Sequence, residues 1–292
     1  MHEPTYDEVL LSGYTAGYES GYTDGQEECG PDYSREYFTI EALEDGNLIV
    51  KKWCDYSIND GDWVSITGET AIPLNDGDKV RFKRESISGG YNGMFSGNTI
   101  ASLVYGNIMS LAYADDFRGK TQAFSTGHLF DSYTGLVSAE NLILPATTLV
   151  SGCYDSMFMG CSKLTVAPEL PATTLARLCY SCMFHTCTSL VVPPELPATT
   201  LAENCYDGMF LGCTSLTTAH ELPATTLADF CYYRMFMMCS SLTSTPELPA
   251  LVLAERSYDS MFLGCTSLTD ARAIHATTLA DFCCHKCSPK QV

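Results

Sequence analysis

A repeat of fixed length occupies the C-terminal half of this 292-residue chain. The segment Leu-Pro-Ala-Thr-Thr-Leu begins at Leu144, Leu170, Leu196 and Leu222, always 26 residues apart. Met-Phe pairs recur in the same register. A fixed period of this size indicates one structural unit per repeat, stacked on its neighbours because a single unit cannot bury its own apolar side.

Each unit is predicted to contain a short strand, a turn and a short helix. Leu201, Cys205 and Met209 follow one another at intervals of four residues, which is helical spacing. Residues 214–219 suit a short strand, and stacked strands about 4.8 Å apart would pair into a parallel sheet. The sequence therefore predicts an α/β solenoid of 26-residue units over residues 141–292.

The repeated string also resembles a known family. The stretch from Leu196 to Leu216, Leu-Pro-Ala-Thr-Thr-Leu-Ala-Glu-Asn-Cys-Tyr-Asp-Gly-Met-Phe-Leu-Gly-Cys-Thr-Ser-Leu, is similar to the BspA-type leucine-rich repeat. The positions that match the family pattern directly are Pro197, Phe210, Gly212, Cys213 and Leu216. The resemblance implies a leucine-rich-repeat solenoid in a surface or adhesion protein of gut-type bacteria. The Gly- and Tyr-rich start and the segment Glu-Ala-Leu-Glu-Asp-Gly resemble proteins of the phages of those bacteria.

Three regions precede the repeats. Residues 1–36 hold nine acidic residues and one basic residue. We interpret them either as an anchor or oligomerisation segment that forms a helix with its Gly and Tyr residues on one side, or as a flexible acidic tail. Residues 37–88 contain short strands separated by Asp-Gly turns, which predicts a small antiparallel, sandwich-like β domain. Residues 89–140 are expected to bridge to the repeats and cap them. The candidate anchor residues are Tyr14, Gly17, Tyr18, Gly21 and Tyr22.

Charge and hydropathy exclude several classes of partner. The chain has 16 Lys and Arg against 35 Asp and Glu, a net charge of −19. Binding to nucleic acid needs clustered cations, so we expect no nucleic-acid partner. No run of about 18 apolar residues is present, so we expect no direct membrane span. The N-terminus lacks the apolar core of a secretion signal, and we expect no such signal.

The 15 cysteines fall mainly into two columns of the repeat. The first column holds Cys153, Cys179, Cys205, Cys231 and Cys283, and the second holds Cys161, Cys187, Cys213, Cys239 and Cys265. Ser257 interrupts the first column and the second has an odd number, so we expect buried free thiols rather than disulfides. Cys283, Cys284, His285 and Cys287 resemble a zinc cluster, but their register continues the repeat. We therefore expect no metal, no cofactor and no catalytic residue.

The residues that vary between units suggest a recognition face. They flank the repeated Cys-Tyr pair, and in helical geometry they would lie together on the side away from Leu201, Cys205 and Met209. The candidate residues are Arg177, Glu203, Asp207, Asp229, Phe230, Tyr233, Arg234, Glu255, Arg256 and Asp259. The strand side, with pairs such as Thr217-Thr218, is an alternative face, and exposed positions also vary without any function.

These features predict a non-enzymatic binding or structural protein. The first hypothesis is an attachment protein of a phage virion, assembled in the host cytoplasm. Its N-terminal region would dock to the larger assembly, and its repeats would bind a host protein or glycan. The alternative is a bacterial cell-surface adhesin or protein-interaction module, and a cysteine-dependent enzyme is the less favoured third class. A homo-oligomer is compatible with both binding hypotheses.

Overall fold

The structure is a computed structural model that describes residues 32–86, 91–270, 274 and 276–285. The chain divides into two compact units, Met1–Asp32 and Tyr33–Val292. All described residues except Asp32 belong to the second unit. The candidate anchor residues lie outside the described residues, as does the predicted helical segment that contains them.

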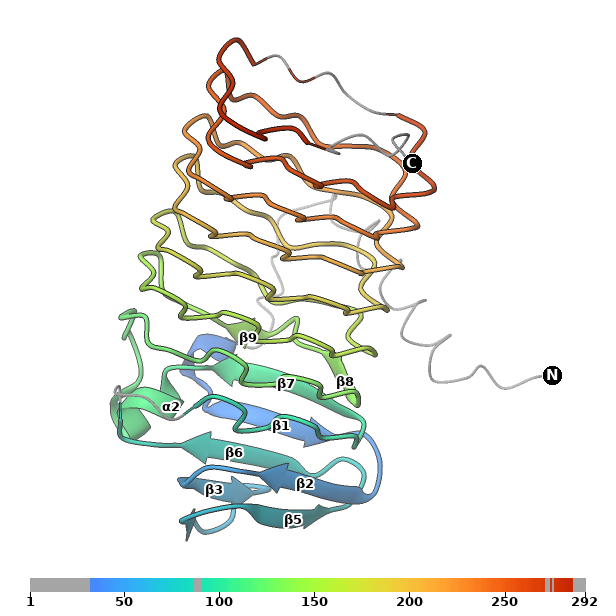
Figure 1. The fold of residues 1–292 in the computed structure, drawn as a ribbon. Helices are drawn as coiled ribbons and strands as arrows, with labels where there is room; N and C mark the ends of the chain where they lie inside the picture. Colours follow the sequence, from blue (N-terminus) through green and yellow to red (C-terminus); the bar gives the residue numbers. More distant parts are fainter. Residues whose placement is uncertain (1–31, 87–90, 271–273, 275, 286–292) are drawn as a thin grey trace, which may run out of the picture. The chain divides into compact units, whose positions relative to one another are not determined.

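Two sheets form the first part of the second unit (Figure 1). The larger sheet has seven strands in the order β4-β3-β6-β1-β7-β8, with β9 also paired to β7, and the smaller sheet pairs β2 with β5. The strands are β1 (Phe38–Ala42), β2 (Gly46–Val50), β3 (Cys54–Ile58), β4 (Val64–Ile66), β5 (Thr70–Leu74), β6 (Lys79–Lys83), β7 (Ser102–Asn107), β8 (Leu136–Ser138) and β9 (Leu142–Ile143). The helical elements are η1 (Tyr33–Arg35), α2 (Ser110–Tyr113) and η2 (Ala114–Asp116).

Alternation of apolar and polar residues sets the faces of these strands. In β6, Val80 and Phe82 are buried while Lys79, Arg81 and Lys83 point away from the core. The sequence predicts short strands at residues 37–43, 47–50, 63–66 and 79–83, where β1, β2, β4 and β6 lie, but it does not predict β3 and β5. Asp-Gly pairs separate several of these strands, as turn chemistry predicts.

The predicted antiparallel domain over residues 37–88 is wrong as a separate sandwich. Strand β7 pairs antiparallel with β1, and β8 and β9 then pair parallel with β7. The large sheet is therefore mixed, and it continues through the region that was expected to be only a bridge.

From Leu144 onward the chain forms stacked layers, one for each 26-residue unit (Figure 1). Layer 1 comprises residues 144–169, layer 2 residues 170–195, layer 3 residues 196–221, layer 4 residues 222–247 and layer 5 residues 248–273, and layer 6 starts at residue 274. Each layer contains a stretch of consecutive turns, called here the turn run, which spans residues 203–212 in layer 3.

Backbone hydrogen bonds in a turn run alternate between two directions. In layer 3, the amides of Cys205 and Met209 donate to carbonyls three residues earlier, at Ala202 and Tyr206. The amides of Tyr206 and Gly208 instead donate to the next layer, to the carbonyls of Cys231 and Tyr233, while the amide of Asp207 again donates three residues back, to Asn204. Every fourth residue has a positive φ, for example 54° at Asn204, 57° at Gly208 and 74° at Gly212. Successive turns thus advance along one edge of the layer.

The predicted helix in each repeat is therefore wrong. Turns that repeat every four residues also place Leu201, Cys205 and Met209 on one side, so the sequence pattern does not separate them from a helix. A helix bonds every amide to the carbonyl four residues earlier, whereas half of these amides bond the neighbouring layer. Among the described residues of the repeats there is no helix.

The predicted parallel sheet in the repeats is wrong as well. Outside the turn runs, the described residues of neighbouring layers form isolated bridges, such as Thr148 with Thr174 and Thr200 with Thr226, and single hydrogen bonds, such as Thr217 N–H to the Val191 carbonyl, but no paired strands. Prolines recur on both sides of these bridges and cannot donate a backbone hydrogen bond. The α/β leucine-rich-repeat solenoid is thus replaced by a mixed sheet of seven strands, a small second sheet and layers built from turns.

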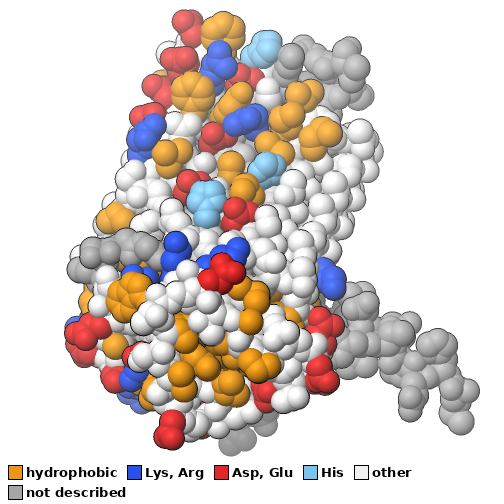
Figure 2. All heavy atoms as spheres, turned by 60° about the horizontal axis from the view of Figure 1, so that its bottom comes forward, with side chains coloured by type: hydrophobic (Ala, Val, Ile, Leu, Met, Phe, Trp, Pro, Cys, Tyr) orange, Lys and Arg blue, Asp and Glu red, His pale blue; other side chains and the backbone are white. Residues whose placement is uncertain are grey.

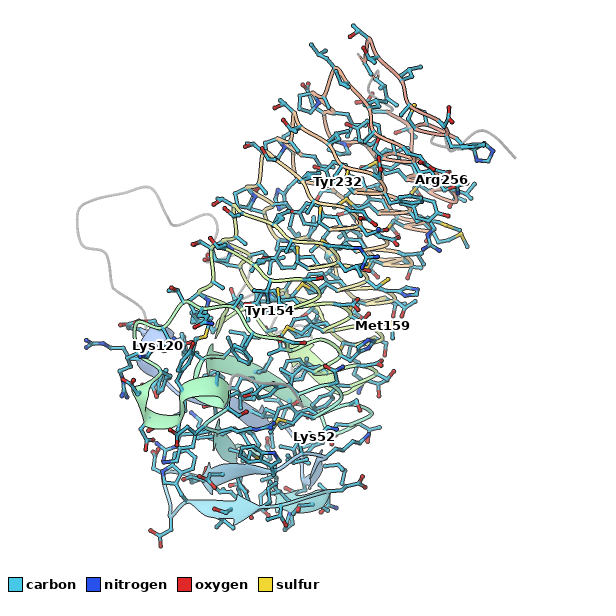
Figure 3. All side chains as sticks on the ribbon, turned by 60° about the vertical axis from the view of Figure 1, so that its left-hand side comes forward. Lys52, Lys120, Tyr154, Met159, Tyr232 and Arg256 are labelled. Carbon is cyan, nitrogen blue, oxygen red and sulfur yellow. The ribbon has the colours of Figure 1, made fainter. Side chains whose placement is uncertain are left out.

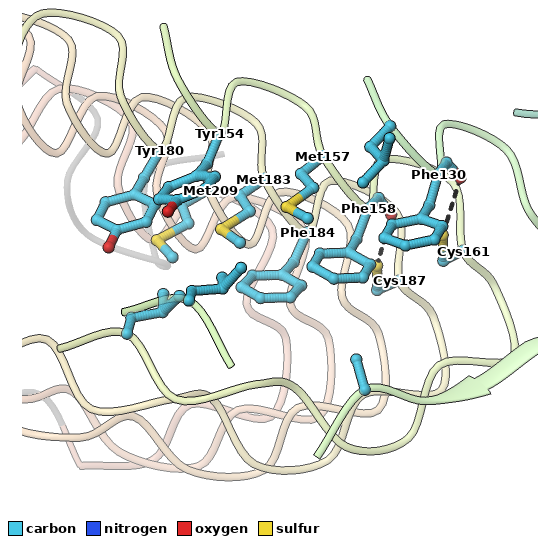
Figure 4. Packing of buried hydrophobic residues seen from close by; sticks show 14 of the residues in the cluster. Phe130, Tyr154, Met157, Phe158, Cys161, Tyr180, Met183, Phe184, Cys187 and Met209 are labelled. Carbon is cyan, nitrogen blue, oxygen red and sulfur yellow. Dashed lines mark hydrogen bonds between the residues drawn. The ribbon is translucent and has the colours of Figure 1, made fainter. Parts of the chain in front are cut away.

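The core of the layers consists of rows of identical side chains (Figure 4). Phenylalanine rings of successive layers stack with centroids 5.1–5.7 Å apart from Phe130 to Phe262, and tyrosine rings stack at 5.7–5.9 Å from Tyr154 to Tyr258. Phe130 also lies 5.7 Å from Phe95 in the first part of the unit. The core is therefore continuous from the sheets into the layers.

Candidate recognition surface

The turn runs direct side chains inward and outward in pairs. In layer 1, Cys153, Tyr154, Met157 and Phe158 are buried in the core, and the pair between them lies at the edge of the layer, with Asp155 half-buried and Ser156 buried against it. We call the outward pairs of all layers the turn face: residues 151–152, 155–156 and 159–160 and their equivalents at intervals of 26. Figure 3 shows Met159 and Arg256 on one edge of the layers, with Tyr154 and Tyr232 among the inner side chains.

All ten candidate recognition residues lie on the turn face. Arg177, Glu203, Asp229 and Glu255 are exposed and form one column, with one residue per layer. Phe230, Tyr233, Arg234, Arg256 and Asp207 are half-buried, and Asp259 is buried. Figure 2 shows hydrophobic, basic, acidic and histidine side chains interspersed on one face of the molecule over the layers.

Contacts between layers join the exposed column in pairs. Arg177 Nε lies 3.3 Å from Glu203 Oε1, and both side chains are about half exposed. The backbone amide of Glu255 donates to Asp229 Oδ1 at 3.0 Å. Exposed ion pairs of this kind contribute little to stability, so this column remains available for contacts with another molecule.

A second group gathers around Arg234 in layer 4. Its guanidinium lies 4.4 Å from the Tyr233 ring centroid and donates to Asp207 Oδ1 at 3.2 Å. The Tyr233 ring meets Phe230 edge-on at 5.7 Å. Burial raises the pKa of Asp207, and Arg234 opposes this shift. Burial also lowers the pKa of His185, with a smaller contribution from Arg234.

Arg256 continues this group into layers 5 and 6. Its guanidinium lies between two rings, 5.8 Å from the centroid of Phe230 and 5.0 Å from that of Phe282. Asp259 lies 3.7 Å from Arg256 and 3.5 Å from His285. Sequence reasoning missed Phe282 because its unit lacks the repeated motif, although its 26-residue register with Phe230 and Arg256 was available.

The alternative face carries threonine ladders. Thr243 Oγ1 donates to the carbonyl of Thr217 at 3.2 Å, and Thr269 Oγ1 to the carbonyl of Thr243 at 3.4 Å. These two hydroxyls therefore already donate hydrogen bonds to the layer below. The variable pair Val191-Val192 is exposed, and a column of exposed glutamates, Glu169, Glu195, Glu221 and Glu247, follows this stretch in successive layers.

The described cysteines are free thiols, most of them buried. Each thiol of the second column donates to the carbonyl of a phenylalanine 29 or 31 residues earlier at 3.0–3.2 Å, as Cys187 does to Phe158 (Figure 4). Burial raises the pKa of Cys153 and Cys179 to about 12. The predicted free thiols of both columns are confirmed for these cysteines.

The described part of the chain contains neither a cluster that could hold a metal ion nor a helix that could span a membrane. No group of three or more His, Cys, Asp or Glu side chains within it is placed to hold a metal ion. Cys287, the last member of the zinc-like string, lies outside the described residues. No helix in that same part has the length and apolar character to cross a bilayer.

Comparison with models of protein families, with curated proteins and with solved structures finds no match for this chain.

Proposed function

We propose that this protein is a non-enzymatic attachment protein of a phage virion, in which the turn face binds a host-cell protein or glycan. One observation carries this proposal. Along the turn runs, inward positions repeat from layer to layer while outward positions change in size, charge and polarity. A stack of nearly identical layers thus presents a surface with a specific pattern.

The composition of that surface supports a role in binding. Arg, Tyr, Phe and Met are enriched at protein interfaces, and the half-buried candidates include Phe230, Tyr233, Arg234 and Arg256. Their contacts with one another limit side-chain freedom before a partner arrives, which lowers the entropy cost of association. The location in a virion rests on the sequence resemblance alone.

The experiment that tests this function has two arms. Mass spectrometry of purified phage particles is expected to detect this chain, and the purified protein is expected to adsorb to host cells and compete with the phage for attachment. Absence of the chain from particles, together with its detection on intact bacterial cells by surface labelling, would instead establish a cell-surface adhesin. Absence from both would remove the attachment function.

A pair of variants separates the two faces. Glu203→Lys changes the exposed column of the turn face, and Thr217→Lys places the same charge on the threonine ladder of the same layer. We expect a loss of adsorption of tenfold or more for the first variant and little change for the second. The reverse result would transfer recognition to the threonine side.

A further inference from the structure

Three exposed carboxylates form the outer column of the turn face in layers 4, 5 and 6. They belong to Asp229, Glu255 and Asp281, which follow one another at intervals of 26 residues and are all exposed. Within the described part of the chain, none of the three forms an ion pair. In layers 2 and 3, by contrast, Arg177 lies 3.3 Å from Glu203 and balances its charge.

The arginines of layers 4 and 5 do not neutralise this outer column. Arg234 donates to Asp207 at 3.2 Å, and Arg256 lies 3.7 Å from Asp259. Both of these carboxylates are more buried than those of the column. His285 of layer 6 also lies 3.5 Å from Asp259. The positive groups that the structure describes here are thus paired with inner carboxylates of the same chain, and the outer column keeps its negative charge.

Aromatic side chains lie beside the charged column. Phe230 and Phe282 directly follow Asp229 and Asp281 in the sequence, and Phe282 is 58% exposed. The Arg256 guanidinium lies over both rings, 5.8 Å from the centroid of Phe230 and 5.0 Å from that of Phe282. It therefore takes one of the two faces on which a sugar ring could stack. Contact with protein side chains does not need an open ring face, and aromatic residues are enriched at protein interfaces.

We propose that the partner of the turn face in layers 4–6 is a protein surface rich in lysine and arginine, and not a glycan. This inference rests on the proposed function and narrows its partner to one class. A partner that covers the exposed carboxylates removes water from them, which costs free energy unless the partner brings opposite charges. A neutral glycan supplies hydroxyl groups but no charge, and an acidic partner would be repelled. Basic residues therefore match the column, and apolar residues match Phe282.

The net charge of the whole chain favours the same class of partner. With a charge of −19, the protein attracts a basic surface before contact is made and repels an acidic one. This attraction reaches about 30 Å at 0.01 M salt but only about 10 Å at 0.1 M. Binding of a basic partner should therefore weaken as the salt concentration rises. Binding of a neutral glycan has no such long-range part and should depend little on salt.

Adsorption of the full chain to treated host cells tests the proposal. Trypsin digests surface proteins after lysine and arginine, whereas mild periodate oxidises the sugars of glycans. We expect trypsin treatment of the cells to reduce adsorption by about tenfold or more, and periodate treatment to leave it within about twofold. Adsorption to untreated cells should also fall by about tenfold or more between about 0.05 M and about 0.5 M salt.

Two neutral variants locate the effect on the column. Glu255→Gln and Asp281→Asn each remove one charge with little change of shape, and each should reduce adsorption about two- to fivefold and make it less sensitive to salt. Glu169→Gln is the matched control, because it removes an exposed carboxylate from the glutamate column outside the turn face, and its adsorption should not change. All three positions are exposed, so thermal unfolding at the wild-type temperature should separate lost recognition from lost folding.

The possible outcomes distinguish this inference from the proposed function. Adsorption that periodate abolishes and trypsin does not makes the partner a glycan, which overturns the inference and leaves the attachment function in place. Adsorption that is independent of salt, or that both neutral variants retain at the wild-type level, overturns it as well, because the column would then lie outside the contact. Failure of the wild type to adsorb to untreated host cells removes the attachment function, and this inference with it.

Discussion

Each buried cysteine of the second column is both an apolar core residue and a hydrogen-bond donor. Cys213 Sγ lies 3.0 Å from the carbonyl oxygen of Phe184 in the layer below. The same contact recurs at 3.1 Å for Cys239 and Cys265. The Phe184 carbonyl also accepts the backbone amide of Cys187 at 3.0 Å, so the thiol supplies a second hydrogen bond to a buried carbonyl that has two lone pairs.

Removing one such donor should be costly. Cys213→Ala removes one of the two hydrogen bonds to the Phe184 carbonyl and leaves a small cavity, and we expect the free energy of unfolding to fall by about 1–3 kcal/mol. Cys182→Ala, at a half-buried position of the turn face, should change it by less than about 0.5 kcal/mol. Urea denaturation measures both, and equal effects would show that the thiol contact contributes nothing.

The buried thiols should also make stability depend on alkaline pH. Burial raises the pKa of Cys153, Cys179 and Cys231 to about 12 in the folded chain, whereas unfolded cysteines titrate near about 8.5. The unfolded chain therefore loses these protons first, and the free energy of unfolding should fall as pH rises above about 8.5.

Urea denaturation at a series of pH values checks this dependence. Cys153→Ala is the matched variant. It removes one buried thiol, so its free energy of unfolding should fall less steeply with rising pH, by the contribution of one proton. A stability that stays flat from pH 8 to pH 10, or a slope that this variant leaves unchanged, would contradict buried neutral thiols.

At the scale of elements, the rows of rings hold the layers in register. Phe210 stacks on Phe184 at 5.7 Å and on Phe236 at 5.5 Å, with the rings nearly parallel. Phe262, near the end of the described row, stacks on Phe236 alone among the described rings. The strength of a layer should therefore depend on its position in the stack.

Truncation along this row tests that dependence. Phe210→Ala removes two ring contacts and leaves a cavity, so we expect a loss of about 3–5 kcal/mol in the free energy of unfolding. Phe262→Ala should cost clearly less, because it removes one contact near the end. Chemical denaturation of both variants provides the comparison, and equal losses would mean that the rows do not act between layers.

The elements also show what the sequence could reveal. The 26-residue period and the buried residues of each unit could be predicted, because burial repeats with the motif. Strands β1, β2, β4 and β6 could be predicted from the alternation of apolar and polar residues and from the Asp-Gly turns. The turn runs were not readable. A period of four residues fits both a helix and a series of turns, and residues such as Asn204 give no sign that φ is positive.

The candidate recognition surface was likewise only partly predictable from the sequence. Arg177, Glu203 and Arg234 could be placed on one side because any regular backbone with that spacing separates them from the core. The strain at Met238 and the position of Arg256 between two rings depend on contacts across layers. Such contacts arise only once the layers are stacked, so they could not be derived from one unit alone.

At the scale of the whole second unit, the sheets and the layers share one core. Aromatic contacts lead from Phe38 through Phe95 and Phe130 to Phe158. The amide of Phe95 donates to the carbonyl of Leu129, which links the first part of the unit to the segment beside the layers. We therefore expect the sheets and the layers to unfold together.

Two probes measure this coupling. Both tryptophans of the chain, Trp53 and Trp63, lie in the sheet part, so tryptophan fluorescence reports on the sheets. Near-UV circular dichroism of the stacked tyrosines reports on the layers. One cooperative transition should give the same midpoint with both probes, and separate midpoints would show that the two parts unfold independently.

The central claim is that the repeats are stacked layers of turns in which alternate amides bond to the next layer. Scalar couplings across hydrogen bonds, measured by NMR on deuterated protein, test it most directly. The account predicts a coupling between the amide nitrogen of Tyr206 and the carbonyl carbon of Cys231, 25 residues ahead. A coupling from Tyr206 to the carbonyl of Ala202 instead, as in a helix, would contradict it.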